Sequence, residues 1–583
     1  MLKPEEYLAG WPDMPYPNFT AWLDAIAAKW QDKTAILYRA GGQKDFSTWS
    51  FRFLQAECRR VAHGILAAGL QKGDRVVLWA ENRPEWMAVW LGTLIAGCVI
   101  VPVDFLAPEK ECENIIRLTR ARAFFYSARK QNFASSLAAA GIRLDALSCI
   151  SADGTPAFAD FGAGAETHLP GVDETGERDP ASIVFTSGTT GFAKGVTLSH
   201  RGIIANVNAA ILSLRPTMED VFINVLPLHH TYPTTCSFLA PLSVGAATII
   251  VEKLVGKVVI DDIRDAGGTF LIAVPLLCDK VMAGIAAGYR KLFPPLRGAL
   301  DILRKIALKK ANRGNFEWGQ TVFRFIRKKA GLASIRIMVA GGGALSTKTA
   351  DFFDSFGFNI VHGYGMSENS PLISVNLPRH KNNPSVGLPV KYTEVKIVDP
   401  DANGLGEIAI RSPSIMLGYF ENSEATAEVI TPDGWLLTGD LGRLDDDGFI
   451  YINGRKKNLI VTSGGKNIYP EEIESHFDGS RIVGQILVMG RRETARNENE
   501  LIFAVVAPNF EALGEDHPGA DLSDEFIRPL IKQEIEAVNR TLPGYKKISD
   551  FTLRREEFEM NAQRKIKRYL YKNYAACSSP VEA

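Results

Sequence analysis

The chain has 583 residues, of which 46% are hydrophobic and 23% charged, and its formal net charge at pH 7 is zero. This length predicts about four domain-sized units, or fewer large ones. The composition is ordinary for a globular protein with a large core. The balanced charge excludes a chain that binds nucleic acid through an overall positive charge, so we expect no nucleic-acid partner.

The spacing of the cysteines and the N-terminal residues indicate the cellular compartment of the protein. The seven cysteines are scattered and form no CxxC pair, which argues against a disulfide framework and against a zinc site. This usage is typical of a reducing cytoplasm. The segment Met1–Glu6 lacks the apolar core of a secretory signal peptide, so we expect a cytoplasmic protein.

One uncharged stretch has the length of a membrane span. Residues 86–103 contain no charged side chain, and these 18 residues reach the lower limit for a transmembrane helix. Gly97 and Pro102 interrupt the stretch, and residues 98–101 are rich in β-branched side chains. We therefore predict a buried helix that leads into a buried strand.

Short apolar runs alternate with helix-length segments through most of the chain. The predicted strands are residues 75–79, 99–103, 123–126, 182–185, 221–226, 247–251 and 335–340. Such alternation is typical of βαβ units around mostly parallel sheets. From residue 385 onward, short alternating strands with Gly, Pro and Asp turns predict an antiparallel, barrel-like subdomain, and residues 458–570 fit a compact α+β domain.

Residues 290–329 stand apart by their charge. They contain twelve basic side chains against two acidic ones, a local net charge of +10. The side chains of Leu300, Leu303, Ile306 and Ala307 recur beside this charge at helical spacing. A basic amphipathic helix fits peripheral contact with anionic lipid headgroups, on the inner face of a membrane. A solvated surface insertion, or a docking site for an acidic carrier protein, is the alternative.

The segment Thr186–Gly195 reads Thr-Ser-Gly-Thr-Thr-Gly-Phe-Ala-Lys-Gly and follows a predicted strand. Hydroxyls and bare backbone N–H groups can hold phosphate oxygens, and Lys194 adds a positive charge. It is not a Walker A loop, because glycine follows Lys194 and the Gly-x4-Gly-Lys spacing is missing. By itself the segment predicts a phosphate-binding loop, with a turn-rich connection as the alternative.

Further motifs make the pattern specific. They are Ala340–Leu345 (Ala-Gly-Gly-Gly-Ala-Leu), His362–Glu368, Trp435–Asp440, Gly454–Glu474 and Gln563–Arg568. With them the chain resembles the adenylate-forming superfamily of acyl- and aryl-CoA synthetases, peptide-synthetase adenylation domains and luciferases. The resemblance extends from Gly73 to Arg568, with the motifs in the family's order. Through Thr462–Ile468 and Lys565–Arg568 the chain is most similar to the long-chain fatty acyl-CoA synthetases.

The resemblance implies an α/β fold with two domains. Residues 1–456 would form a large N-terminal domain of stacked, mostly parallel α/β sheets with the barrel-like subdomain, and would hold the ATP and acyl sites. Lys457 would be the hinge, and residues 458–583 a small mobile α+β domain. Rotation about the hinge would bring Gly464 and Gly465 to the channel for the pantetheine arm of coenzyme A.

The resemblance also implies an ATP site. The residues implied to hold the β- and γ-phosphates are Thr186, Ser187, Gly188, Thr189, Thr190, Gly191 and Lys194. The residues implied to lie beside the adenine are Gly341, Gly342, Gly343, Tyr364 and Gly365, with Tyr364 stacking on the base. Ser367, where the family usually has threonine, would donate to the α-phosphate, and Asp440 would accept both ribose hydroxyls with help from Arg455.

The residues that the resemblance implies for catalysis are Lys565, Glu368, Thr190 and His230. Glu368 would bind Mg²⁺, for which a hard carboxylate is a suitable ligand. Lys565 would bridge the substrate carboxylate and the α-phosphate as a mobile point charge. His230 would lie where the acyl pocket meets the CoA tunnel, although His229 or a packing role competes with this reading. Each of these polar residues alone could serve a turn; together they indicate a site.

The implied chemistry has two half-reactions. A carboxylate attacks the α-phosphorus of ATP to give an acyl-adenylate and pyrophosphate, and the thiol of coenzyme A then displaces AMP. No enzyme nucleophile is needed, so catalysis depends on positioning and charge neutralisation. Three positions depart from the family pattern without removing a ligand: Ala193 for proline, Asn458 for aspartate and Arg564 for glycine.

The substrate is open at this point. A long-chain fatty acid is the first choice, and a medium-chain or aromatic acid is the alternative. The acceptor is coenzyme A or the phosphopantetheine of an acyl carrier protein. A nucleotide-binding scaffold without catalysis is the rival from another class, and the presence of Glu368, Asp440, Arg455 and Lys565 together argues against it.

Overall fold

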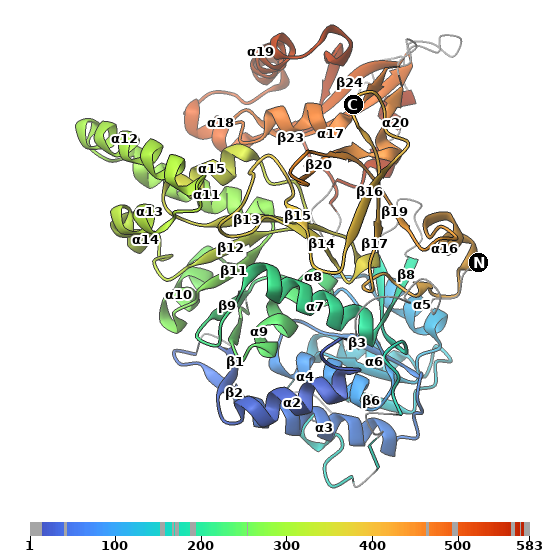
Figure 1. Cartoon of the computed structure of the whole chain (residues 1–583). Coiled ribbons are helices and arrows are strands. Elements are labelled where there is room, and N and C mark those ends of the chain that lie inside the picture. Colours follow the sequence, from blue (N-terminus) through green and yellow to red (C-terminus); the bar gives the residue numbers. More distant parts are fainter. Residues whose placement is uncertain are drawn as a thin grey trace. The chain divides into compact units, whose positions relative to one another are not determined.

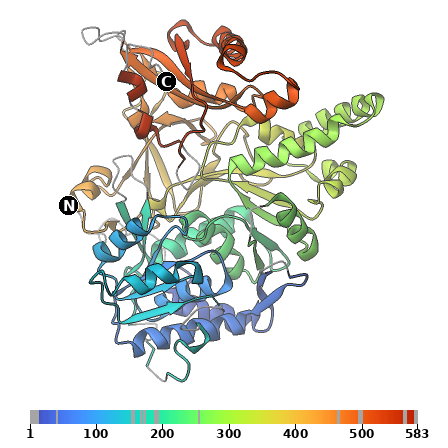
Figure 2. The ribbon, with the colours of Figure 1, turned by 180° about the vertical axis from the view of Figure 1, so that it is seen from behind.

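The computed structural model describes residues 14–39, 43–151, 158–165, 168–169, 174–186, 194–252, 255–461, 466–492, 500–560, 566–571 and 573–576. Two compact units are present. The described residues of Met1–Thr186, Ala193–Val395 and Ile410–Leu436 form the larger unit, and those of Lys396–Ala409 and Leu437–Ala583 form the smaller unit. Figures 1 and 2 show their elements from opposite sides.

A nine-stranded sheet runs through the larger unit in the order β15-β14-β13-β12-β11-β9-β10-β1-β2. Its strands are β1 (Thr34–Tyr38), β2 (Ser47–Ser50), β9 (Val221–Asn224), β10 (Ala247–Ile250), β11 (Phe270–Ala273), β12 (Ile337–Ala340), β13 (Ile360–Gly365), β14 (Leu372–Val375) and β15 (Leu388–Pro389). The strands from β13 to β1 pair in parallel, and β14, β15 and β2 pair antiparallel at the edges. The apolar runs of β10, β11 and β12 are buried throughout, as a sheet covered on both faces requires.

A seven-stranded sheet in the same unit has the order β18-β8-β7-β4-β3-β5-β6. Its strands are β3 (Arg75–Trp79), β4 (Val99–Pro102), β5 (Ala123–Tyr126), β6 (Ala146–Cys149), β7 (Pro180–Thr186), β8 (Lys194–Ser199) and β18 (Gly418–Tyr419). The strands from β7 to β6 are parallel, whereas β8 and β18 are antiparallel. The predicted alternation of strands and helices around mostly parallel sheets is confirmed.

Helices connect these strands and cover the sheets (Figure 1). Those of the larger unit are α2 (Phe19–Trp30), α3 (Phe51–Ala67), α4 (Pro84–Ile95), α5 (Glu109–Thr119), α6 (Gln131–Ser136), α7 (His200–Leu214), α8 (Thr231–Pro233), α9 (Ala240–Ser243), α10 (Gly256–Ala266), α11 (Pro275–Arg290), α12 (Pro294–Ala311), α13 (Glu317–Val322), α14 (Arg324–Lys329), α15 (Thr347–Ser355) and α16 (Ser423–Val429). Serine caps begin three of them: Ser50 Oγ accepts from Phe53 N in α3, Ser199 Oγ from Gly202 N in α7, and Ser346 Oγ from Thr349 N in α15.

The uncharged stretch 86–103 is a buried helix followed by a buried strand, as predicted. Every residue of α4 except Glu85 is buried, and all of β4 is buried between neighbouring strands. Its apolar character therefore serves the protein core. Among the described residues no helix is both long and apolar enough to cross a membrane. The six cysteines in the described ranges are unpaired and buried.

The smaller unit has its own sheets and core. The strands that lie in it wholly or for most of their length are β16 (Glu394–Val398), β17 (Gly406–Arg411), β19 (Leu436–Leu444), β20 (Ile450–Arg455), β21 (Ile460–Val461), β22 (Asn467–Ile468), β23 (Val483–Arg492), β24 (Glu500–Pro508) and β25 (Asp550–Leu553). Its helices are α17 (Pro470–Glu474), α18 (Phe510–Asp516), α19 (Asp524–Thr541) and α20 (Asn573–Ala576). Ile527, Ile531 and Ile535 recur along one buried face of α19 and join the core beside β23 and β24.

The barrel-like subdomain expected after residue 385 has a simpler form. Strands β16, β17, β19 and β20 make a four-stranded sheet in that order, and no closed barrel is found in the described part of the chain. The alternating pattern identifies antiparallel strands but does not determine whether the first and last strands pair. The two compact units do not reveal where the chain pivots, so a hinge at Lys457 between residues 1–456 and 458–583 stays a prediction.

A buried ion pair holds the end of α15 against the loop after β14. Lys381 Nζ lies 2.6 Å from Asp354 Oδ2 and donates at 2.7 Å to the carbonyl of Ile360. The side chains are 3% and 0% exposed, and Asn383 Nδ2 donates to the same carboxylate. A charge this deep is tolerated only because its partner neutralises it.

We expect Lys381→Met to destabilise the larger unit by about 3–5 kcal/mol, because Asp354 would be left buried without a cation. The matched control is Arg379→Met, which breaks a pair with Glu317 whose side chains are 77% and 62% exposed. That pair contributes less than about 1 kcal/mol. Thermal unfolding should separate the variants by several degrees, and equal shifts would contradict this account.

Candidate active site

Two of the motif loops meet at one edge of the nine-stranded sheet. Gly341–Gly343 follow β12, and Tyr364 and Gly365 end β13. Strands β12 and β13 pair in parallel, from Met338 opposite Ile360 to Ala340 opposite His362. Because parallel strands end at the same edge, the glycine segment and the Tyr364 segment lie together where open α/β sheets bind ligands.

Different constraints apply to the three glycines of this loop. A Cβ on Gly341 would lie 2.8 Å from the ring of Tyr232, and Gly342 has a φ of +79°. A Cβ on Gly343 would only make ordinary contact with Pro275 at 3.6 Å. Packing thus accounts for Gly341 and backbone conformation for Gly342. Neither accounts for Gly343, which is consistent with the predicted bare wall beside a base.

The strand pair β7–β8 closes the predicted phosphate loop. Thr186 ends β7, Lys194 begins β8, and the two are direct partners in the antiparallel ladder. The ends of the loop are therefore held side by side. The loop residues between them, which include Ser187, Gly188, Thr189, Thr190 and Gly191, lie outside the described residues.

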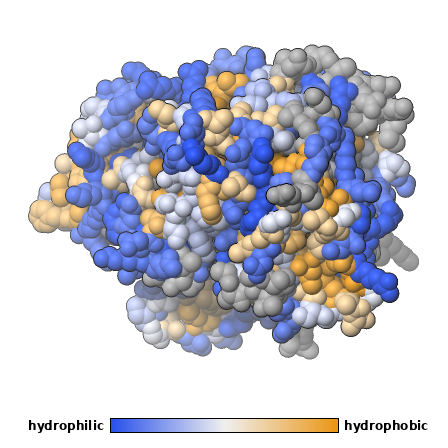
Figure 3. Space-filling model, turned by 90° about the horizontal axis from the view of Figure 1, so that it is seen from below, coloured by the Kyte–Doolittle hydropathy of each residue, from blue (hydrophilic) through white to orange (hydrophobic). Residues whose placement is uncertain are grey.

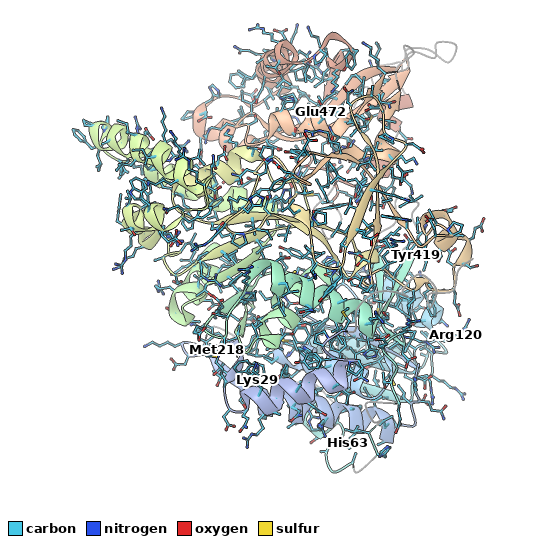
Figure 4. The ribbon with its side chains drawn as sticks, in the orientation of Figure 1. Lys29, His63, Arg120, Met218, Tyr419 and Glu472 are labelled. Carbon is cyan, nitrogen blue, oxygen red and sulfur yellow. The ribbon has the colours of Figure 1, made fainter. Side chains whose placement is uncertain are left out.

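Glu368 is held by a residue that the sequence motifs do not indicate. Tyr419, labelled in Figure 4, lies in β18 and its hydroxyl donates to Glu368 Oε1 at 2.9 Å. Lys194 Nζ lies 4.7 Å from the centre of the Tyr419 ring. Strand β18 pairs with β8, and Met416 N donates to the carbonyl of Glu368 at 2.8 Å. Tyr419 therefore links the end of the phosphate loop to the predicted metal ligand.

The surroundings of Glu368 fit a shared metal site. Burial and the Glu368 carboxylate raise the pKa of Tyr419, which keeps its hydroxyl a donor at neutral pH. No cluster of three or more His, Cys, Asp or Glu side chains occurs in the described part of the chain. A single carboxylate suits Mg²⁺ that substrate phosphates also hold, rather than a cation bound by protein groups alone. Ser367 and Glu368 lie in one short 3₁₀ turn after β13.

A pair of histidines lies at the start of α8. The rings of His229 and His230 are 4.0 Å apart, and His229 Nε2 is 3.8 Å from Asp104 Oδ2. Burial lowers the pKa of His230, with the Asp104 carboxylate opposing it, and burial lowers the pKa of His229 further. Both rings are therefore neutral at physiological pH. Their Nε2 atoms are buried without a hydrogen-bond partner in the described structure.

A small pocket lies beside these histidines. Its walls are Trp90, Pro102, Ser182, Val184, Leu198, Ile203, His229, Thr231, Thr234, Thr235 and Ser370. The backbone next to it, Thr234–Leu239, is a π-helix, a distortion frequently found at functional sites. His229 lines this pocket and His230 does not. The predicted gating role is therefore not assigned to one of the two histidines by this geometry.

In the smaller unit Asp440 and Arg455 are brought together by strand pairing. They are direct partners in the β19–β20 ladder, and Arg455 Nε lies 2.6 Å from Asp440 Oδ1. The Asp440 side chain is 5% exposed and the Arg455 side chain 44%. The guanidinium holds the carboxylate in one orientation, as a group that binds a diol requires.

The turn that contains Lys457 is short and exposed. Lys457 lies in a 3₁₀ turn, Lys456–Asn458, between β20 and β21. Its neighbours are anchored, because Lys456 Nζ lies 2.6 Å from Glu407 Oε2 and Asn458 Nδ2 donates to Glu471. The loop residues Gly464 and Gly465, and Lys565, lie outside the described residues.

The two cations after Lys565 already have partners. Lys567 Nζ lies 3.6 Å from Glu559 Oε2, and Arg568 contacts Glu474 and donates to the carbonyl of Val488 at 2.9 Å. Both therefore act within the smaller unit. Arg564 and Lys565, the other cations of this motif, lie outside the described residues, so the role that the resemblance implies for Lys565 stays a prediction.

Comparison with known proteins identifies the family of the chain. Residues 23–420 match the family of AMP-binding enzymes, and the chain belongs to this family. It is therefore an adenylate-forming enzyme, an AMP-forming acid–thiol ligase.

Relatives extend the similarity beyond that range. A peroxisomal long chain acyl-CoA synthetase of Arabidopsis thaliana is 30% identical, over 88% of this chain and 78% of its own. A long-chain-fatty-acid–CoA ligase of Bacillus subtilis is 27% identical, over 88% and 91%. A chloroplastic long-chain-fatty-acid–[acyl-carrier-protein] ligase of Arabidopsis thaliana is 25% identical, over 83% and 75%. The chain is thus most like long-chain fatty acyl-CoA synthetases.

Solved structures share the fold. An anthranilate CoA ligase in complex with anthranoyl-AMP superposes with a TM-score of 0.77 at 21% identity, over 99% of both chains. ATP-bound MatB from Rhodopseudomonas palustris superposes with a TM-score of 0.75 at 24% identity, over 96% of this chain and 99% of its own.

We expect Tyr419→Phe to raise the Mg²⁺ concentration for half-maximal activity about 10-fold, because Glu368 loses the hydroxyl that orients it. Binding of Mn²⁺ to the enzyme–ATP complex, followed by electron paramagnetic resonance, should weaken in parallel. The control is Tyr451→Phe, which removes a hydroxyl that donates to Asp445 Oδ2 at the same 2.9 Å in the smaller unit. Unchanged metal dependence in Tyr419→Phe would contradict the orienting role.

Proposed function

We propose that the protein ligates a long-chain fatty acid to coenzyme A through an acyl-adenylate, with ATP and Mg²⁺, and releases AMP and pyrophosphate. The observation that carries this proposal is the similarity to a long chain acyl-CoA synthetase over 88% of the chain. That length takes in both compact units. The alternatives differ only in the acid or in the thiol acceptor.

The residues of the larger unit would prepare the ATP. The phosphate loop Thr186–Lys194 would hold the β- and γ-phosphates, with Gly343 and Tyr364 beside the base. Glu368, fixed by Tyr419, would hold the Mg²⁺ that neutralises phosphate charge. From the smaller unit Asp440 would accept the ribose hydroxyls, since its carboxylate is already oriented by Arg455.

The reaction needs no covalent intermediate with the enzyme. The fatty acid carboxylate attacks the α-phosphorus and pyrophosphate leaves, so the energetic barrier is the repulsion between two anions. A cation placed between them lowers that barrier. Lys565 would supply it, and rotation about Lys457 would then withdraw it so that the thiol of coenzyme A reaches the activated carbonyl.

The pocket beside His229 has a mixed lining. Its lining combines five aliphatic or aromatic side chains with five hydroxyl-bearing side chains and His229, so it has both apolar walls and groups that can hydrogen-bond. A neutral imidazole at its wall also costs less to bury than a charged one. We therefore keep a gating role for this histidine pair, in which His230 is the sequence candidate.

Two observations support the alternative acid and the alternative acceptor. One structural neighbour is an anthranilate CoA ligase, whose acid is aromatic. One relative is a ligase that uses an acyl carrier protein. Because coenzyme A and the carrier present the same phosphopantetheine thiol, the chemistry at the carbonyl does not distinguish them.

Lys565→Ala should lower the rate of adenylate formation at least about 100-fold, because the charge between the two anions is lost. The same variant should still convert supplied acyl-adenylate to thioester. The matched control is Lys567→Ala, whose ammonium lies 3.6 Å from Glu559 in the smaller unit and should not affect either step. Equal loss of both half-reactions in Lys565→Ala would exclude this role.

The substrate is tested by AMP release from ATP with fatty acids of graded chain length and with anthranilate, each with coenzyme A. We expect kcat/KM to rise with chain length and anthranilate to be a poor substrate. The same series with an acyl carrier protein tests the acceptor. Turnover restricted to anthranilate, or to the carrier protein, would replace the proposed function by the corresponding alternative.

A further inference from the structure

The basic segment is a helical projection from the larger unit. The predicted helix around Leu300 and Ala307 is confirmed as α12, and α13 and α14 follow it. In both ribbon views α12 extends outward from the sheet (Figures 1 and 2). Leu300, Ala307 and Ala311 are the buried residues of its inner side, and Arg304 packs over the rings of Phe352 and Phe356.

The outer side of this projection is apolar and exposed. Phe293, in the turn before α12, is 71% exposed, Leu296 is 47%, Ile302 is 63% and Ile306 is 39% exposed. Side chains at positions 302, 305, 306 and 309 share one face of a helix, so Ile302 and Ile306 alternate there with Lys305 and Lys309. Figure 3 shows hydrophobic colour at the projecting end on the left, where α12 lies in Figure 1.

Most of the positive charge on the projection is unpaired. Asp301 accepts from Tyr289 Oη at 2.8 Å and pairs with Arg304, and Glu317 pairs with Arg379 at 2.6 Å. Both acids of the segment are thereby neutralised. Among the described residues the following exposed or half-exposed cations have no acidic partner: Arg290, Lys291, Arg297, Lys305, Lys309, Lys310, Arg313, Arg324, Lys328 and Lys329.

The buried cation of the segment has a different role. Arg327 is 3% exposed and donates at 2.6 Å to the carbonyl of Gly357 and at 2.5 Å to that of Ile335. It fastens α14 to the body of the unit. The unpaired cations therefore lie on a surface that is held to the larger unit by buried contacts such as those of Arg327.

We propose that the turn before α12 and the outer side of α12 form a docking surface for an anionic lipid bilayer. Phe293, Leu296, Ile302 and Ile306 would enter the headgroup region, and Lys305, Lys309 and their neighbours would face lipid phosphates. This pairing of exposed apolar groups with surrounding cations is what an interfacial helix requires. The inference is independent of which acid the enzyme activates.

Charge and apolar exposure together favour lipid over the alternatives. A solvated insertion gives no reason for apolar side chains on the same helix face as lysines. A nucleic-acid-binding surface would combine cations with aromatic side chains that stack on bases at regular spacing. The outer side of α12 has isoleucines instead. An acidic carrier protein would be attracted by the cations, and it enters the test as a separate outcome.

The test is binding of the full-length protein to vesicles of phosphatidylglycerol and phosphatidylcholine, compared with vesicles of phosphatidylcholine alone, by co-sedimentation. We expect binding to the anionic vesicles only, and loss of it as salt is raised. Lys305→Glu with Lys309→Glu should lower the partition coefficient at least about 30-fold, which corresponds to about 1 kcal/mol for each cation. Phe293→Ser should lower it about 10-fold.

Control variants distinguish loss of binding at this surface from a general effect of reversing charge or removing an exposed apolar side chain. Lys532→Glu with Arg540→Glu reverses two exposed cations on α19, and Leu118→Ser removes a 46% exposed apolar side chain on α5. Both should bind vesicles like the parent protein. Equal binding to neutral vesicles, or the same loss in the control variants, would overturn the proposal. Charge reversal that weakens binding to an acyl carrier protein but leaves vesicle binding unchanged would overturn it too.

Discussion

The parallel pairing of β12 with β13 determines where the candidate nucleotide site lies in the larger unit. The register that places Met338 opposite Ile360 and Ala340 opposite His362 brings the ends of two strands to one edge. Two loops that are separate in sequence then share that edge. The glycines after β12 allow close approach. Tyr364 contributes a ring, and Glu368, four residues later, contributes a carboxylate.

The antiparallel strands β8 and β18 position two further residues of the candidate site in the larger unit. Strand β8 carries Lys194 and β18 carries Tyr419, so the end of the predicted phosphate loop and Glu368 are connected through one tyrosine. If Glu368 binds a metal as predicted, the Tyr419 hydroxyl would fix the orientation of its carboxylate on the short 3₁₀ turn. The same argument applies to Asp440, which Arg455 orients within the smaller unit.

Buried and exposed charged side chains differ in their partners. Lys381 and Asp354 are buried and neutralise each other, and Arg327 is buried against carbonyl groups. The cations on the outer side of α12 have no acidic partner among the described residues. Buried charges need a partner at hydrogen-bond distance to be stable, whereas exposed ones are stabilised by water. Charge without a partner is therefore informative about function only on the surface.

The sequence by itself determined the class of fold and most of the candidate residues. Strand and helix periodicity depends on local spacing, so the βαβ alternation, the buried stretch 86–103 and the helix at Leu300 were all predictable. Motifs such as Thr186–Gly195 and Gly341–Gly343 are contiguous, which is why a family resemblance could assign them. Their roles, and that of Lys565, remain predictions.

Only the tertiary structure decided which distant residues meet. Tyr419 lies in a two-residue strand with no periodicity, and its contact with Glu368 depends on the pairing of β18 with β8. The alternation after residue 385 predicted antiparallel strands, but only the structure shows that they form an open four-stranded sheet, because the pairing of first and last strands depends on long-range geometry. Likewise, the sequence showed the charge of residues 290–329, but burial of Leu300 and exposure of Ile302 were fixed by packing against α15. Local patterns specify elements, and long-range packing specifies contacts between them.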